Sequence, residues 1–221
     1  MYKYMPGRAT PLVIGEYYHL FNRGSEKRDI FTQPRDYKRF LKTLYYYQYT
    51  GPKISFSKFT KSDFNSFKPN PENKLVQILC YCLMPNHIHF LLKQVKENGI
   101  SIFMSQLFNS YTKYFNTKYN RVGALFQGVF KSVLMESDEQ LKHTSRYIHL
   151  NPVVAGLTND LFSYNWSSYY DFLTGNEKIS SVNQVLNFFP SLGKYYKFVE
   201  DQVGYSKALR IIKRQAIDFE E

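Results

Sequence analysis

The sequence has little cysteine and no long apolar run. Its only cysteines, Cys80 and Cys82, lie two positions apart in an apolar stretch, too close along one strand for a disulfide framework. We expect buried, reduced thiols, as in a cytoplasmic protein. No run approaches the roughly 18 apolar residues of a membrane span, and residues 1–10 lack the apolar stretch of a signal peptide. The sequence therefore predicts a cytoplasmic protein without a membrane partner.

Acidic residues are scarce relative to basic ones. The chain has 18 Asp and Glu against 29 Lys and Arg, a formal net charge of +11, and 18% of its residues are aromatic. A basic surface attracts polyanions, and Tyr and Phe rings can stack on unpaired bases. The rings can equally fill a core, and the charge can serve solubility alone. Composition therefore makes nucleic-acid binding a hypothesis that motifs must support.

Hydrophobic patterns predict a single order of strands and helices. The expected strands are 16–21, 75–84, 87–93 and 128–135, and the expected helices are 34–47, 101–119 and one from 137 that ends before Pro152. Strand, helix, two strands, helix, strand and helix is the order of a ferredoxin-like (RRM-like) unit with an added helix. We expect an α+β fold, an antiparallel sheet with helices on one face. Residues 1–155, with an insertion at 50–74, would form one domain and 156–221 a helical extension.

Two further segments invite a nucleic-acid interpretation. Residues 50–74 form a Gly- and Pro-containing insertion in which phenylalanines alternate with lysines. This insertion would either grip a single strand or form a disordered flap. The last predicted helix carries a basic stripe, which is either a solvated face or a DNA contact: Lys207, Arg210, Lys213 and Arg214.

His87 and His89 are the sharpest chemical signal. Alternate residues of a strand share a face, so both imidazoles point the same way and Ile88 points oppositely. Two such rings can bind one divalent ion. Spacing alone does not separate this interpretation from two ordinary core or surface histidines.

A second constellation lies on the last helix before Pro152. Tyr147 and Asn151 are four residues apart and therefore share a helix face, with His143 one turn earlier. Asn151 can offer an amide oxygen to a metal, and Tyr147 can aim its phenol at a phosphate. By spacing alone, Tyr147 can also simply pack against the sheet.

Several segments, in the right order, resemble one enzyme family. Residues 81–92, with the run His87-Ile88-His89, resemble the His-hydrophobic-His motif of the HUH endonucleases, in the form found in the IS200-like, REP-associated tyrosine transposases. Residues 146–152 resemble the family's nucleophile helix, and 19–24, 123–132 and 165–169 also match its pattern. The resemblance spans roughly residues 14–205. Val129 departs from the pattern, because an Arg is usual there, and the 50–74 insertion lies outside it.

The resemblance implies a mechanism and a set of site residues. Tyr147 would be the nucleophile and His87, His89 and Asn151 the ligands of Mg²⁺ or Mn²⁺. The substrate would be single-stranded DNA, often beside a hairpin, cut through a 5′-phosphotyrosine and rejoined without ATP. Candidate phosphate contacts, chosen by nearness to the motifs, are Arg23, Lys113, Arg121 and Lys131.

Other interpretations stay open at this point. The same sheet topology serves non-catalytic RNA-recognition modules, although those carry aromatics where this chain carries paired histidines. A metal hydrolase that uses water, with Tyr147 structural, is a third class, and a replication initiator or relaxase is a variant of the first. Related enzymes act either as monomers or as homodimers that share a tyrosine helix.

Overall fold

The computed structural model describes residues 11–50, 56–58, 66–177 and 179–204. Its strands are β1 (Tyr17–Arg23), β2 (Val76–Met84), β3 (His87–Gln94) and β4 (Lys131–Leu134). Its α-helices are α1 (Pro34–Tyr47), α3 (Gly99–Lys118), α4 (Asp138–Val154), α5 (Tyr169–Thr174), α6 (Asn183–Leu186) and α7 (Leu192–Glu200). None of the described helices is both long and apolar enough to cross a membrane.

The four strands form one antiparallel sheet in the order β2-β3-β1-β4. A hairpin joins β2 to β3, with Met84 opposite His87. The first strand lies between β3 and β4, so that Phe21 is opposite both His89 and Lys131. This is the ferredoxin-like order, and the predicted α+β fold is confirmed.

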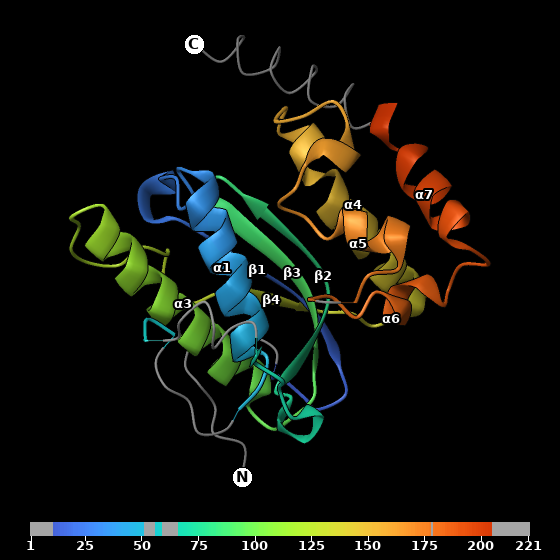
Figure 1. The fold of residues 1–221 in the computed structure, drawn as a ribbon. Coiled ribbons are helices and arrows are strands. Elements are labelled where there is room, and N and C mark those ends of the chain that lie inside the picture. The colour runs from blue at the N-terminus through green and yellow to red at the C-terminus, as the bar shows by residue number, and fades with distance from the viewer. Residues whose placement is uncertain (1–10, 51–55, 59–65, 178, 205–221) are drawn as a thin grey trace.

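Helices cover both faces of the sheet (Figure 1). As expected of the ferredoxin-like unit, α1 and α3 pack on one face, against residues such as Leu20 and Phe90. A second core lies on the other face of β2 and β3, where α4 and the C-terminal helices bring residues such as Ile148 and Tyr195 against Leu91. The core under α4 therefore continues into segments beyond residue 155.

The strand β2 contains a β-bulge at this second core. Ile78 is opposite Leu92 and Cys80 is opposite Leu91, so Leu79 is the extra residue. Both cysteines are fully buried and unpaired by any disulfide, and burial raises the pKa of each thiol. The expectation of buried, reduced thiols is met.

The helix α4 does not end before Pro152, as the sequence suggested, but continues to Val154. A proline inside a helix removes one backbone hydrogen bond. Here Pro152 and Val153 are buried, and Ala155 N–H donates to the Asn151 carbonyl. Packing of this last turn thus offsets the lost bond.

His149 fixes α4 to the C-terminal helices. Its fully buried ring lies 2.8 Å (Nδ1) from the hydroxyl of Tyr195 on α7 and 2.9 Å (Nε2) from Ser168 Oγ, just before α5. Burial lowers its pKa to about 3, so the ring is neutral near pH 7. This buried network sets the position of the helix that carries Tyr147.

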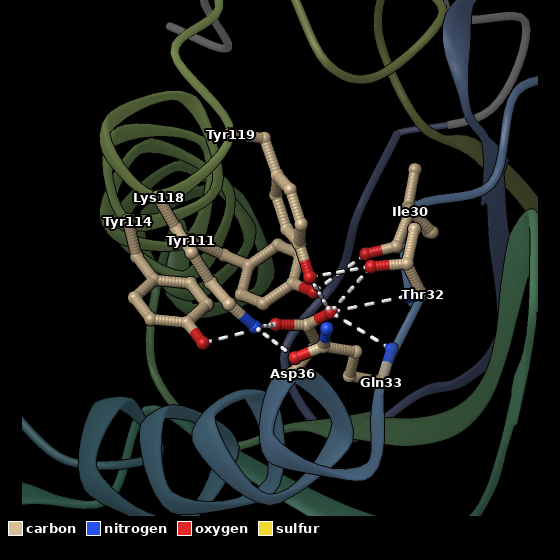
Figure 2. Close-up of polar contacts among 8 residues, drawn as sticks. All are labelled: Ile30, Thr32, Gln33, Asp36, Tyr111, Tyr114, Lys118 and Tyr119. Atoms are coloured by element: carbon tan, nitrogen blue, oxygen red, sulfur yellow. Dashed lines mark hydrogen bonds and ion pairs between the residues drawn. The ribbon is translucent and has the colours of Figure 1, made fainter.

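On the other face, α1 and α3 are joined through Asp36 (Figure 2). Its fully buried carboxylate accepts hydrogen bonds from Lys118 Nζ (2.6 Å), Tyr119 (2.7 Å) and Tyr114 (2.9 Å). Burial alone would raise the pKa of Asp36, but bonds from these groups and from Thr32 lower it to about 2.

Part of the 50–74 insertion belongs to the core. The rings of Phe56 and Phe67 lie 5.2 and 5.1 Å from that of Tyr46, and Phe56 is only 3% exposed. The buried Phe56 ring is therefore not available as a grip for unpaired bases, whereas Phe67 is only partly buried. Other members of the predicted features lie outside the described residues: Phe59, Phe64, and the basic stripe of Lys207, Arg210, Lys213 and Arg214.

Candidate active site

Three imidazoles gather on one face of the sheet. Strand alternation turns His87 and His89 of β3 toward α4, as predicted, and β1 adds His19 beside them. The ring of His89 lies 5.1 Å from that of His87, nearly perpendicular to it, and 5.2 Å from that of His19, stacked on it.

Hydrogen bonds at Nδ1 orient two of these rings. The Nδ1 of His87 lies 2.7 Å from Asn86 Oδ1, which can only accept, so the proton is on Nδ1 and Nε2 keeps a lone pair. The Nδ1 of His89 lies 3.0 Å from His19 Nε2, and either ring can be the donor. With His89 as the donor, its Nε2 also keeps a lone pair.

All three rings are uncharged near neutral pH. Burial, helped by the neighbouring His19, His87 and Arg23, lowers the pKa of His89 to about 2. Burial and Arg23 lower that of His87 to about 4, and burial lowers that of His19 to about 4. Neutral imidazole is the form that binds metal ions.

The helix α4 presents Tyr147 and Asn151 to these imidazoles. The Tyr147 side chain is 50% exposed, and its ring lies 5.6 Å from that of His89 and 5.9 Å from that of His19, edge-on to both. One turn on, Asn151 Nδ2 donates to the Tyr147 carbonyl at 2.8 Å, which leaves the amide oxygen for another partner. Tyr147 is thus neither buried nor packed away.

One cavity of about 760 Å³ is lined by His87, His89, Tyr147 and Asn151 but not by His19, and no carboxylate is among its lining residues. Arg23 and Lys131 line it too, and so does Val129, whose side chain is 72% exposed. The remaining lining residues are Phe21, Asn22, Met84, Gln127, Val154 and Ala155. The cavity therefore combines neutral imidazoles, a phenol and two cations.

The other two predicted DNA contacts lie elsewhere. Lys113 lines a groove between α1 and α3, on the opposite face of the sheet. Arg121 donates to Asn116 Oδ1 at 2.7 Å and to the Ala124 carbonyl at 3.4 Å, and so braces its own loop. Lys113 and Arg121 are close to the motifs in the sequence, but they do not line the cavity.

The donor set for a metal is limited. In the described parts of the chain no cluster of three or more His, Cys, Asp or Glu side chains has the geometry to hold a metal ion. His143 does not join the imidazoles, because its Nε2 lies 2.7 Å from Glu139 and its ring meets that of Phe198 edge-on, 5.4 Å between centroids. A third protein ligand beside His87 and His89 would therefore be an amide, and the cavity is lined by three: Asn22, Gln127 and Asn151. The oxygen of Asn22 already accepts from the Arg23 N–H, whereas Asn151 uses only its Nδ2.

His19 was missing from the predicted site. It alternates with Tyr17 and Phe21 along β1, a pattern that places all three on one face. Only the sheet order, with β1 next to β3, brings this face beside His89.

Comparisons with known proteins agree with this fold. Residues 52–151, which include both β3 histidines and Tyr147, match the family model described as IS200-like transposase. The predicted resemblance to tyrosine transposases of this type is therefore confirmed. A solved structure described as the REP-associated tyrosine transposase bound to a REP hairpin has the same fold, with a TM-score of 0.53 and 13% sequence identity. The match covers 79% of this chain and 86% of that one. No curated protein matches the sequence.

Proposed function

We propose that this chain cuts and rejoins single-stranded DNA, next to a hairpin, with Tyr147 as the nucleophile. The observation that carries the proposal is the half-exposed Tyr147 phenol, which shares a cavity with neutral His87 and His89 and whose ring lies 5.6 Å from that of His89. The match of residues 52–151 to IS200-like transposases supports the chemistry. The hairpin bound in the similar structure supports the substrate class.

The proposed reaction exchanges one phosphodiester bond for another. The phenolic oxygen of Tyr147 attacks the phosphorus, and the bond from phosphorus to the 3′-oxygen breaks. The phenol proton passes to solvent, and the departing oxygen takes up a proton to become a 3′-hydroxyl. The 5′-phosphotyrosine keeps the bond energy, so a second 3′-hydroxyl can reverse the step and join strands.

The cavity fits a divalent ion held by His87, His89 and Asn151. The supporting observation is that both histidine Nδ1 atoms are within hydrogen-bond distance of a neighbour, as is usual for metal-ligating histidines. When bound, Mg²⁺ or Mn²⁺ would polarise a non-bridging oxygen of the scissile phosphate. Two imidazoles favour Mn²⁺ over Mg²⁺, which prefers oxygen ligands.

Arg23 and Lys131 would hold the phosphates that flank the scissile bond. Both line the cavity, and no carboxylate forms an ion pair with either in the described part of the chain. Val129 adds an exposed apolar surface instead of the charge usual in the family.

The packing argues against a plain RNA-recognition module. Such modules bind unpaired bases on an open sheet face. Here helices cover that face of β2 and β3, where Cys82 and Leu91 are fully buried. A water-using hydrolase is the remaining rival, and a covalent protein–DNA adduct distinguishes it from the proposal.

The test is a Tyr147→Phe variant incubated with hairpin-flanked single-stranded DNA and Mn²⁺. Wild-type protein should form an SDS-resistant adduct, and the variant should form none, because the change removes only the phenolic oxygen. Tyr170→Phe is the matched control, since Tyr170 is also 50% exposed but lies on α5. Peptide mapping that places the DNA on any other tyrosine would overturn the assignment.

The tyrosines of α3 are poor competitors. Tyr111 is fully buried and donates to the Ile30 carbonyl, and Tyr114 and Tyr119 both donate to Asp36 (Figure 2). Phe at any of these positions should leave the adduct in place.

A further inference from the structure

A second cationic groove lies between α1 and α3, across the sheet from Tyr147. It has a volume of about 830 Å³. Its lining comes from both helices and the segment between them, and contains no carboxylate: Arg35, Arg39, Tyr47, Phe56, Ser57, Gln106, Asn109, Ser110, Lys113, Tyr114, Thr117 and Lys118.

Three of its four cations have no counter-ion among the residues that the structure describes. Lys118 is paired with Asp36 at 2.6 Å. Arg35, Arg39 and Lys113 form no ion pair with any residue that the structure describes. Because no Asp or Glu is among the described lining residues and Asp36 is paired with Lys118, the described part of the groove carries a net positive charge.

Arg39 is held rigidly and left incompletely bonded. Its guanidinium lies 4.3 Å from the centre of the Phe56 ring and 5.4 Å from that of Tyr114. Its Nε is buried without a hydrogen-bond partner, and so is the side-chain oxygen of Gln106. Buried polar atoms without partners are costly, and a ligand that both accepts and donates hydrogen bonds would remove the cost.

The polar residues of α3 form one stripe along the groove. The members of this stripe are separated by one, three or four positions and therefore share one face of the helix. They are Gln106, Asn109, Ser110, Lys113 and Thr117. From Gln106 to Thr117 there are eleven rises along the helix, which span about 16 Å of helix axis. This length suits an extended polymer better than a single small anion.

We propose that this groove binds the sugar–phosphate backbone of a single-stranded nucleic acid, at a site separate from the Tyr147 cavity. Arg35, Arg39 and Lys113 bind the phosphates, and Gln106 accepts from a base amino group. The ligand is DNA, a choice that rests on the proposed function. The groove itself does not depend on Tyr147 or a metal, because it lies on the other face of the sheet.

The test is a charge-reversal double variant, Arg35→Glu with Lys113→Glu, whose side chains are exposed. Binding to a labelled 30-nucleotide single strand is followed by fluorescence anisotropy in EDTA, so that cleavage plays no part. Lys38→Glu with Lys194→Glu is the matched control, because both lysines are exposed, outside the groove, and give the same charge change.

The groove variant should bind at least about tenfold more weakly than the control variant. Its log–log salt slope should be smaller than that of wild type by about 1.4, since each lost phosphate contact on a single strand removes about 0.7. Equal binding by the two variants, or no binding by wild type, would overturn the proposal.

A second measurement separates this inference from the proposed function. With a short oligonucleotide at saturating concentration, the groove variant should form the Tyr147 adduct as wild type does, because the cavity is intact. Loss of that adduct would mean that the substitutions act on the cavity and would refute a separate site. Absence of the adduct in wild type alone would instead refute the proposed function and leave the anisotropy result standing.

Discussion

Replacing Asp36 by Asn should destabilise the contact between α1 and α3. The carboxylate is completely buried and accepts bonds from Lys118, Tyr114 and Tyr119 (Figure 2). The Asn side chain has the same shape but no negative charge to pair with the Lys118 ammonium group. Its NH₂ group, a donor, would also face groups that donate to the carboxylate in the wild type, such as Tyr114 and Tyr119.

The magnitude follows from the pKa of the carboxyl. Its shift from 3.8 to about 2 corresponds to roughly 2.4 kcal/mol at 1.36 kcal/mol per pH unit. Screening by nearby solvent reduces this to about 1–2 kcal/mol. Unsatisfied donors left by the amide add about 1–2 kcal/mol. The free energy of unfolding should therefore fall by about 2–4 kcal/mol, and Tm by about 5–12 °C for a chain of this size.

The pH dependence gives the sharper assay. The pKa of Asp36 is lower in the folded protein than in the unfolded chain, so its ionised carboxylate stabilises the folded state. This contribution to the free energy of unfolding is complete above the unfolded pKa of 3.8 and is lost as the pH falls through about 2. Urea titrations should show a constant gap between wild type and Asp36→Asn from pH 7 to 5. At pH 3 the gap should narrow by about 0.5–1 kcal/mol, because roughly half of the charge contribution is then lost. Asp29→Asn, the same change at an exposed position, should leave stability unchanged. A gap that is absent at pH 7, or that does not narrow in acid, would refute this reasoning.

Two further predictions concern the imidazoles. His89→Ala should abolish Mn²⁺ binding, measured by calorimetry, and adduct formation, while circular dichroism shows a folded chain; retention of either would contradict the ligand assignment. His19→Phe should weaken Mn²⁺ binding about 10–100-fold, because His89 loses the partner that orients its ring, whereas binding of DNA in EDTA should not change. His19→Gln, which restores an acceptor, should recover much of the affinity, and equal affinities for both variants would count against the orienting role.

The elements with strong local signals were predictable. The bounds of α1 matched the expectation, Pro34–Tyr47, because Pro34 stands in its first turn and Gln33 and Asp36 form a capping box. A helical extension after residue 155 was expected, but its individual helices were not located, since α5 and α6 have six and four residues and are too short to show a hydrophobic period. Their place depends on contacts such as those of His149, which no local pattern encodes.

For the candidate site too, relations within one element were predictable and relations between elements were not. Spacing within one element gave the shared face of His87 and His89 and that of Tyr147 and Asn151. Relations between elements needed the sheet order, so His19 was missed. Lys113 was chosen by sequence distance, but α3 lies across the sheet from the cavity. The roles of the residues that do meet in the cavity stay predictions.

The placement of α4 bears on how many chains one reaction requires. Tyr147 lies 5.6 Å from His89 of the same chain, and the buried bonds of His149 to Tyr195 and Ser168 hold its helix there. We therefore expect the proposed nucleophile, Tyr147, and the imidazoles to work in cis. Mixing Tyr147→Phe chains with His89→Ala chains should give no complementation in the adduct assay, at any protein concentration. Restored adduct in the mixture would mean that two chains exchange this helix, at the cost of breaking and remaking the His149 network.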